Sequence, residues 1–413
     1  MNIFDYIVIG AGPTGLTLCH KLKEKNKTVL VLEANDEVGG LCRTKYINGH
    51  IMDIGGHFLE TKYQDVYDFI FKFFPKENFY QINPRIAKIN LNGVDIDYPL
   101  ESNLWQLPIK EQISYLISVI RNGEGLDKPA PTNYEEWIRW KLGDKICDNY
   151  LIPYNIKLWG VEPKELDIDW LYKIPRINVE EVLQYSLEKK PDVEKFPAHK
   201  RPFYPKKNGY GEVMNAIAKP IMDNIKVNYE VKSLVYNEDD KTWLVNNEFK
   251  AKNIINAGCP WTDMYKILGN PKEISKDIEK IKYNKIVISL YESEEDYNFH
   301  WRYIPDLKQQ HHREFPISNF VLNSPKRSVF TETNLNRFNE KTLTFKGKNI
   351  YNYITRAGYP IPVVGKTQAI KNILAVYEKK NLFGLGRWGE HQHHNHDICI
   401  KHALDWVENN VNK

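Results

Sequence analysis

The stretch DYIVIGAGPTGLTLCHKLKEKNKTVLVLEAND, residues 5–36, decides the fold of this 413-residue chain. Residues 5–9 form an apolar run of the kind found in a buried strand. Residues 16–25 then carry apolar side chains at helical spacing, and residues 28–32 form a second apolar run. The order strand, turn, helix, strand predicts the first βαβ unit of a parallel sheet.

The turn between the first strand and the helix has the pattern GxGxxG, formed by Gly10, Gly12 and Gly15. The glycines allow a tight turn and a close approach of the backbone to a pyrophosphate, which the free amides of the helix N-terminus attract. The second strand ends at Glu33, eighteen residues after Gly15, where an acid can bind a ribose hydroxyl. Because all of these features are in register, we predict a dinucleotide-binding site that also includes Pro13 and Thr14.

Two further glycine pairs favour one kind of dinucleotide. Gly39–Gly40 follows the ribose acid closely, in EANDEVGGLCRT, and Gly55–Gly56 lies in DIGGHF at residues 53–58. The first pair is typical of FAD enzymes that lay the flavin along the first domain, and NAD dehydrogenases generally lack it. His57 would then lie beside the isoalloxazine ring, although a histidine after two glycines is also an ordinary turn residue. We therefore predict FAD as the cofactor.

The bulk composition excludes several classes of protein. The chain has 57 Lys plus Arg against 53 Asp plus Glu, a formal charge of +4, so no nucleic-acid partner is expected. No run approaches eighteen apolar residues and no cleavable leader begins the chain, so we expect neither a membrane span nor secretion. The five cysteines are scattered without a CxxC pair, which favours a reducing compartment and hence the cytoplasm.

The remainder predicts an α/β architecture in which a discontinuous Rossmann-like FAD-binding domain encloses two insertions. The helical spacing, broken by the loop LDKPAPTNYEEW, and the later alternating runs IVISLY and SVFTET set the boundaries. The expected FAD-binding domain comprises residues 1–95, 200–265 and 360–413, the helical substrate-binding insertion 96–199, and the antiparallel sheet substrate domain 266–359. The cleft between them is the expected substrate site.

Over nearly its whole length the chain resembles the UDP-galactopyranose mutases, flavoenzymes within the wider group of amine-oxidase-like FAD proteins. The segments that carry the resemblance are YPLESNLWQLP (98–108), YNIKLWGVEPKEL (154–166), WRYIPDLKQQHHREFPISNF (301–320), AGYPIP (357–362) and GRWG (386–389). The resemblance implies that Asn155 and Trp159 hold the uracil. It also implies that Tyr303 faces the substrate, that Arg313 and Tyr359 bind the diphosphate, and that Arg387, on a strand, lies against the cofactor.

The chain departs from the family pattern at three places. A diphosphate tyrosine of the family is Phe320 here, and a second substrate tyrosine is His393. A further diphosphate arginine aligns only with Lys173 or Arg176. Two missing hydroxyls and one displaced cation leave the identity of the nucleotide sugar open, with UDP-galactose as the default.

The family chemistry assigns tasks to the remaining residues. In the family, N5 of the reduced flavin attacks the anomeric carbon, UDP leaves, and the sugar ring opens and recloses through another hydroxyl. The protein supplies orientation and charge, for which we select His57 and Arg313. The resemblance also implies NADH or NADPH as a reductant, and it leaves a homo-oligomer open. The predicted cofactor contacts outside the glycine-rich turn are Glu33, Gly40, Leu41, Gly56, His57, Val231, Arg387, Asn395 and His396.

The segment HQHHNHD, residues 391–397, contains four histidines. His391, His393, His394 and His396 lack the i, i+4 helical pairing of a zinc motif, so we expect no metal site there. The resemblance instead places the start of a helix near Asn395 under the flavin pyrimidine, where unpaired amides supply positive potential.

Two alternatives to the mutase remain open. One is an FAD-dependent amine oxidase or desaturase-type oxidoreductase, which shares the N-terminal motifs but has no use for a diphosphate clamp. The other is a flavin-binding protein that has lost its activity, or a mutase homologue that acts on a different nucleotide sugar. The Phe320 and His393 replacements favour this second alternative.

Overall fold

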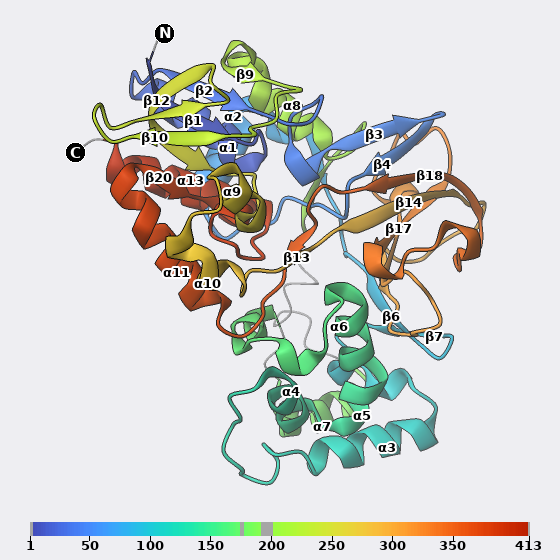
Figure 1. The fold of residues 1–413 in the computed structure, drawn as a ribbon. Coiled ribbons are helices and arrows are strands. Elements are labelled where there is room, and N and C mark those ends of the chain that lie inside the picture. Colours follow the sequence, from blue (N-terminus) through green and yellow to red (C-terminus); the bar gives the residue numbers. More distant parts are fainter. Residues whose placement is uncertain (1–2, 174–176, 191–200, 412–413) are drawn as a thin grey trace.

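A parallel-centred sheet forms the nucleotide-binding unit in the computed structural model, which describes residues 3–173, 177–190 and 201–411 (Figure 1). The strand order is β10-β11-β12-β1-β2-β9, and β20 pairs with β12. The strands are β1 (Ile3–Ile9), β2 (Val29–Leu32), β9 (Ile225–Lys226), β10 (Leu234–Asn237), β11 (Thr242–Val245), β12 (Phe249–Asn256) and β20 (Leu382–Gly384). The pairs among β12, β1, β2, β9 and β20 are parallel, as the βαβ pattern predicted.

Residues 6–9 of strand β1 are buried on both faces, which explains the unbroken apolar run in this part of the strand. Tyr6 and Val8 belong to one core cluster, and Ile7 and Ile9 belong to another. The helices of this unit are α1 (Pro13–Glu24), α2 (Gln64–Phe73), α8 (Gly211–Ala218), α9 (Trp261–Ile267), α10 (Ser275–Ile278), α11 (Lys366–Tyr377), α12 (Gly386–Gly389) and α13 (His396–Asn410). Side chains of α1 and α13 pack in the first cluster, and those of α9 and α11 pack in the second.

The second large sheet has the order β18-β14-β17-β16-β15-β6-β7. Its strands are β6 (Ala87–Leu91), β7 (Val94–Asp97), β14 (Ile286–Glu292), β15 (Trp301–Tyr303), β16 (Arg313–Pro316), β17 (Ser328–Asn334) and β18 (Lys348–Ile354). All neighbouring pairs are antiparallel except β15 and β6. The short pairs β3 (Thr44–Ile47) with β4 (His50–Asp53), β5 (Phe79–Gln81) with β8 (Phe203–Pro205), and β13 (Tyr283–Asn284) with β19 (Tyr359–Pro360) complete the strands.

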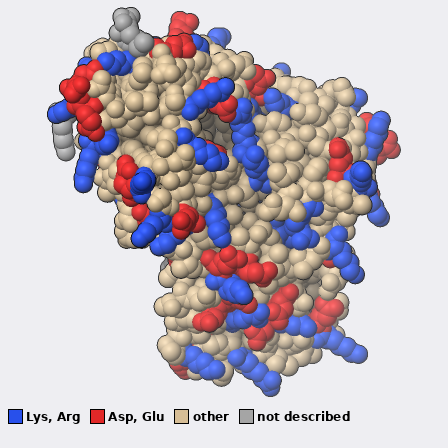
Figure 2. Space-filling view, viewed as in Figure 1, with Lys and Arg blue, Asp and Glu red and all other residues tan. Residues whose placement is uncertain are grey.

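The helical unit forms the lower body in Figure 1 and comprises α3 (Ile109–Ile120), α4 (Tyr134–Leu142), α5 (Asp144–Ile146), α6 (Ile152–Trp159) and α7 (Val179–Glu188). A π-helical turn over Cys147–Leu151 joins α5 to α6. The apolar core of the helical unit includes Tyr134, Ile138 and Trp159. Lys/Arg and Asp/Glu side chains are intermixed over the face shown in Figure 2, in keeping with the near-balanced charge.

The α/β class with helical and antiparallel-sheet insertions is confirmed, and one boundary is corrected. Residues 87–95 were expected in the FAD-binding domain and residues 96–97 in the helical insertion, but β6 pairs with β15 and β7 with β6, so both strands belong to the second sheet. The reason is that the partner of β6 lies over 200 residues away, at Trp301–Tyr303, and no local pattern reveals it. Within the described residues, no helix is long and apolar enough to cross a bilayer.

Candidate functional site

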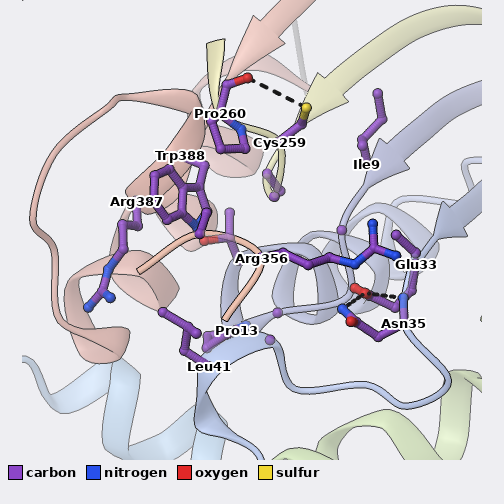
Figure 3. A pocket seen from close by; sticks show the side chains of 18 of the residues that line it. Ile9, Pro13, Glu33, Asn35, Leu41, Cys259, Pro260, Arg356, Arg387 and Trp388 are labelled. Atoms are coloured by element: carbon purple, nitrogen blue, oxygen red, sulfur yellow. Dashed lines mark hydrogen bonds between the residues drawn. The ribbon is translucent and has the colours of Figure 1, made fainter. Parts of the chain in front are cut away.

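A cavity of about 280 Å³ lies at the carboxyl ends of β1, β2 and β12, where open α/β sheets bind ligands (Figure 3). Its walls come from all three sequence pieces of the nucleotide-binding unit. Predicted cofactor residues that line it are Gly10, Gly12, Pro13, Thr14, Glu33, Gly40, Leu41, His57, Val231, Arg387 and His396. Gly15, Gly56 and Asn395 are not in the lining.

The glycine-rich turn is held by close packing that side chains would break. Gly10 has φ of +103°, and a Cβ there would lie 2.7 Å from the Gly258 Cα atom. A Cβ on Gly15 would lie 1.9 Å from the carbonyl oxygen of Gly10, so this glycine brings α1 against the turn. Gly12 is the N-cap of α1 and lines the cavity, so the helix N-terminus opens toward a ligand there.

The Glu33 carboxylate is 5% exposed and stands at the end of β2. Its Oε2 accepts a hydrogen bond from the Ala11 amide at 2.8 Å, and its Oε1 accepts from the backbone and side-chain amides of Asn35 at 2.8 and 2.6 Å. The acid is thereby fixed at the cavity wall, at the end of β2. Arg356 lines the same end, close to this pair in Figure 3.

The opposite end of the cavity carries two neutral imidazoles. Burial, together with the charge of Arg387, lowers the pKa of His396 to about 4. Burial also lowers the pKa of His57 to about 3, with His396 and Arg387 acting in the same direction. His57 is held by the Gly55 carbonyl at 3.1 Å, and His396 shares a 2.6 Å hydrogen bond with the Tyr210 hydroxyl.

Arg387 is held by three hydrogen bonds to two backbone carbonyls. It donates to the His394 oxygen from Nε and Nη2, at 3.0 and 2.8 Å, and to the Gly358 oxygen at 3.4 Å. The expected strand for GRWG is instead the one-turn helix α12. Helix α13 begins at His396 with Asn395 as N-cap, which confirms the predicted helix start.

Next to Arg387, four predicted substrate residues form one cluster: Trp159, Arg313, Tyr359 and His393. Arg313 donates to the Tyr359 hydroxyl at 2.5 Å, and the His393 ring stacks on Tyr359 with centroids 4.9 Å apart. Trp159 meets the edges of both rings at about 6 Å. Arg387 also lies over the Tyr359 ring, at 5.8 Å, so Tyr359 connects the cluster to the cavity.

A buried carboxylate, Glu332, fixes Arg313. It is 1% exposed, and its Oε2 lies 2.6 Å from Nη2 of Arg313. Burial acts to raise the pKa of Glu332, but the Arg313 guanidinium and His312 outweigh it and lower the pKa to about 2. The strand register explains the arrangement, because Arg313 on β16 pairs with Tyr303 on one side and with Glu332 on the other.

Asn155 and Trp159 are joined to one another on α6. The Asn155 Oδ1 accepts from the indole N–H of Trp159 at 3.0 Å, and its Nδ2 donates to the Leu151 oxygen at 2.7 Å. Both side chains are buried, with Trp159 only 1% exposed. In this arrangement Asn155 orients the indole against Tyr359 and His393.

Phe320 and Lys173 complete the predicted substrate residues that the structure describes. Phe320 is buried beside Phe58 and Tyr204, with ring centroids 5.1 and 5.6 Å away, in an aromatic layer of the core. Lys173 ends a short 3-10 helix, and Arg176 lies outside the described residues.

Sequence reasoning missed three residues of this region. No local sequence pattern marks Glu332, because its partner Arg313 is on another strand. Arg43 lines the cavity, is 5% exposed and donates to the Gly40 oxygen and the Tyr353 hydroxyl, both at 2.6 Å. Its place directly after GGLC was the available clue. Tyr210, which holds His396, follows a glycine in a loop and offered none.

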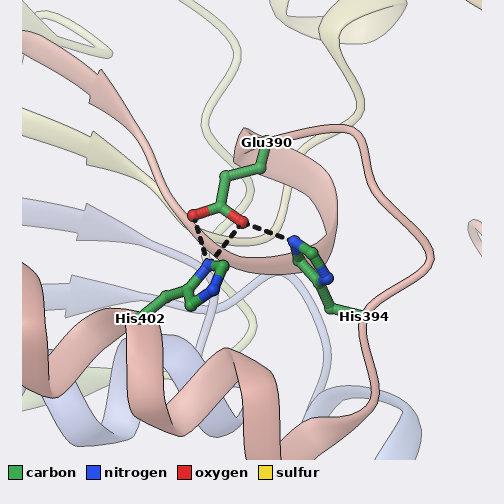
Figure 4. A group of neighbouring side chains, drawn as sticks. All are labelled: Glu390, His394 and His402. Atoms are coloured by element: carbon green, nitrogen blue, oxygen red, sulfur yellow. Dashed lines mark hydrogen bonds and ion pairs between the residues drawn. The ribbon is translucent and has the colours of Figure 1, made fainter. Parts of the chain in front are cut away.

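The histidine-rich segment divides among separate environments. His391 bonds to the Lys282 oxygen at 3.1 Å, His393 stacks on Tyr359, and His396 meets Tyr210. His394 instead joins Glu390 and His402, a group that is shown in Figure 4.

Comparison with known proteins agrees with this geometry. Residues 8–73 match the NAD(P)-binding Rossmann-like domain family. The chain is 26% identical over 266 residues to a UDP-galactopyranose mutase of Mycoplasma genitalium, covering 62% of this chain and 61% of that relative. It is 24% identical over 187 residues to a dTDP-fucopyranose mutase of Escherichia coli, covering 42% and 47%. These alignments thus span less than two thirds of each relative.

A solved structure of reduced UDP-galactopyranose mutase superposes with a TM-score of 0.84 at 21% identity, over 100% of this chain and 94% of that one. Fold and cavity together define a dinucleotide-binding protein of the Rossmann type with two inserted units. Within that class, the chain is similar to UDP-galactopyranose mutases in sequence and in fold, which confirms the resemblance found in the motifs.

Proposed function

We propose that this protein is a flavin-dependent mutase that interconverts the pyranose and furanose forms of a nucleotide sugar, with UDP-galactose as the default substrate. The observation that carries the proposal is the contact of Arg313 and Arg387 with a single ring, Tyr359, directly beside the dinucleotide cavity. Two guanidinium groups next to a dinucleotide site suit a ligand that carries a diphosphate.

The cavity fits FAD as the dinucleotide. The glycine turn leaves room that a Cβ would fill, Glu33 stands where a ribose hydroxyl binds, and Arg43 and Arg387 add positive charge to the walls. Bound and reduced, the flavin would supply a nucleophile for the anomeric carbon of the sugar. NADH or NADPH is our proposed reductant, and the five unpaired cysteines favour the cytoplasm as the compartment.

The residues of the chain perform orientation and charge stabilisation. Arg313, fixed by Glu332, would bind the diphosphate and stabilise the negative charge that develops on the leaving group. Tyr359 would add a hydroxyl donor. His57 remains neutral at physiological pH, so its imidazole can hydrogen-bond near the ring without adding charge. Trp159, oriented by Asn155, would form the wall against which the nucleotide base packs.

Turnover by the reduced protein tests the proposal. The protein is reduced with dithionite and incubated with UDP-galactofuranose, and product is followed by chromatography. We expect UDP-galactopyranose only from the reduced protein. Oxygen consumption with an amine substrate would replace the proposal with an oxidase, and UDP binding without turnover of any nucleotide sugar would show a binding protein without this activity.

A second candidate substrate follows from one observation. His393 occupies a substrate-tyrosine position and stacks on Tyr359, and one relative is named for dTDP-fucopyranose. The same assay with dTDP-fucofuranose compares the two nucleotide sugars directly. Faster turnover of the dTDP-sugar would assign this protein to that substrate.

The diphosphate role has its own test in Arg313→Ala. Losing a charge-assisted hydrogen bond should weaken UDP binding by roughly tenfold to a hundredfold, with the flavin spectrum unchanged. Arg302→Ala is the matched control: Arg302 also lies 2.6 Å from a carboxylate, that of Glu314, and is 21% exposed against 22% for Arg313. Its strand neighbours place it on the other face of the sheet. Equal weakening by both variants, or flavin loss in Arg313→Ala, would remove Arg313 from the diphosphate site.

A further inference from the structure

Glu390, His394 and His402 form a compact group (Figure 4), and His394 also lines the cavity. Glu390 follows α12, His394 lies in the loop, and His402 is on α13. The Glu390 carboxylate lies 2.7 Å from Nε2 of His394 and 2.8 Å from Nδ1 of His402. One donor atom from each residue falls within 4.8 Å of the other two.

This donor set is that of a divalent metal site. Two imidazole nitrogens and one carboxylate oxygen are the protein ligands of many zinc sites that keep an open position for water. Zinc bonds of about 2.0–2.2 Å would place the ligand atoms roughly 3.3 Å apart in a tetrahedron. The carboxylate therefore needs to retreat by about half an ångström, and the two imidazole nitrogens, which lie within 4.8 Å of one another, need to approach, as the two hydrogen bonds are replaced by metal bonds.

The three side chains are partly exposed, so an ion can reach them, and their contacts with one another already hold them together. The side chains of His394 and Glu390 are 19% and 21% exposed, and that of His402 is 39% exposed. The two imidazole rings already lie edge to face, with centroids 4.8 Å apart. The other histidines of the segment have different partners, so the convergence is specific to His394.

We propose that Glu390, His394 and His402 bind one divalent transition-metal ion, for which zinc is the natural occupant. This departs from the expectation of no metal in the segment, because two of the three ligands lie outside the four histidines on which that expectation rested. Water would complete the coordination. The inference does not depend on the proposed function.

The ion would hold in place the loop that contains His394, a residue of the cavity wall. His394 lines the cavity, and its carbonyl oxygen accepts two hydrogen bonds from Arg387. Fixing the His394 side chain therefore also fixes the backbone that orients Arg387. The ligands come from the loop and from the two helices beside it, so the ion would hold the loop between the helices.

Cobalt titration of the full-length protein tests the site. The purified protein is stripped with a chelator, desalted and titrated with Co²⁺, whose visible d–d bands report ligation by nitrogen and oxygen. We expect one equivalent per chain, release of Co²⁺ by Zn²⁺, and zinc in the protein as purified from zinc-supplemented medium. A spectrum equal to that of aqueous Co²⁺ would overturn the proposal.

Three variants localise the ion. His402→Gln and Glu390→Gln should each weaken Co²⁺ binding at least tenfold, while His393→Gln, one residue from a ligand and with the same ring removed, should keep it. His402 is on an exposed part of α13, so His402→Gln gives the decisive result if Glu390→Gln does not fold. Unchanged binding in His402→Gln would place the metal elsewhere and refute the assignment.

Discussion

The contact between Arg313 and Glu332 is the strongest electrostatic feature of the candidate substrate cluster. The carboxylate is 1% exposed and the N–O distance is 2.6 Å. A buried ion pair of this kind contributes little net stability, but removing one partner leaves the other charge without compensation. The pair therefore serves to hold a cation where a ligand can reach it.

Glu332→Gln tests the cost of that arrangement. Breaking a buried pair should lower the free energy of unfolding by about 3 kcal/mol, measured by urea denaturation. Glu230→Gln is the matched control, because Glu230 lies at the same 2.6 Å from Arg356 with both side chains at least half exposed. The control should change stability by less than about 1 kcal/mol. Equal losses would contradict the role of burial.

His312 gives a second prediction at this scale, on pH. Its side chain is 0% exposed, and burial lowers its pKa to about 4. An imidazole with a depressed pKa contributes full stability above its unfolded pKa of about 6.5, and this contribution falls as the pH decreases toward 4. Between pH 7 and pH 5, His312→Gln should lose about 2 kcal/mol less than the wild type. Unfolding at the two pH values measures this difference, and parallel losses would refute it.

The turn between β1 and α1 shows how one element positions a ligand site. Gly10, Gly12 and Gly15 have different tasks within it, since the first and third permit close packing and the second faces the cavity. Helix α1 is thereby placed with its N-terminal end at the cavity wall, an arrangement that favours a bound anion.

Paired alanine variants separate these tasks. Gly15→Ala places a Cβ 1.9 Å from the Gly10 oxygen and should destabilise the fold, with a loss of several degrees in melting temperature or of soluble protein. Gly12→Ala meets only the Gly40 Cα atom, at 3.8 Å, so it should keep the melting temperature of the apoprotein and weaken FAD binding. Thermal melting measures the loss of stability, and flavin titration measures the weaker FAD binding. A stable Gly15→Ala protein would show that the packing is unimportant.

Local patterns made the glycine turn predictable, and distant partners hid the rest. Strand, turn, helix and acid all fall within residues 5–36, so the sequence encodes them without tertiary information. Glu332 is different, because it meets Arg313 only through the register of β16 and β17. The cluster at His394 likewise required His402, which α13 brings back toward the loop.

The molecule as a whole builds its cavity from segments far apart in the sequence. The glycine turn comes from the N-terminal piece, Val231 from the middle, and Arg387 and His396 from the C-terminal piece. A dinucleotide that touches all three would therefore stabilise the entire nucleotide-binding unit and not one loop.

FAD titration of the apoprotein measures this coupling. A ligand that binds only the folded protein adds about 2.7 kcal/mol at a hundredfold excess over its Kd, so the melting temperature should rise by a few degrees. AMP, which can occupy only the adenosine end, is the comparison ligand; it should bind with a higher Kd and therefore give a smaller rise than FAD at the same concentration. No rise at saturating FAD would contradict a cofactor that bridges the three pieces.

The position of β1 between β2 and β12 has a consequence for biosynthesis. One edge of β1 pairs with β2, which ends at residue 32. The other edge pairs with residues 250–256 of β12. Until the ribosome has synthesised β12, the edge of β1 that pairs with it stays exposed, and this edge carries Ile and Val. An exposed apolar strand edge promotes aggregation, and a pairing between distant residues slows folding. A nascent chain arrested near residue 150 should accordingly associate with a chaperone, and one arrested after completion of α13 should not.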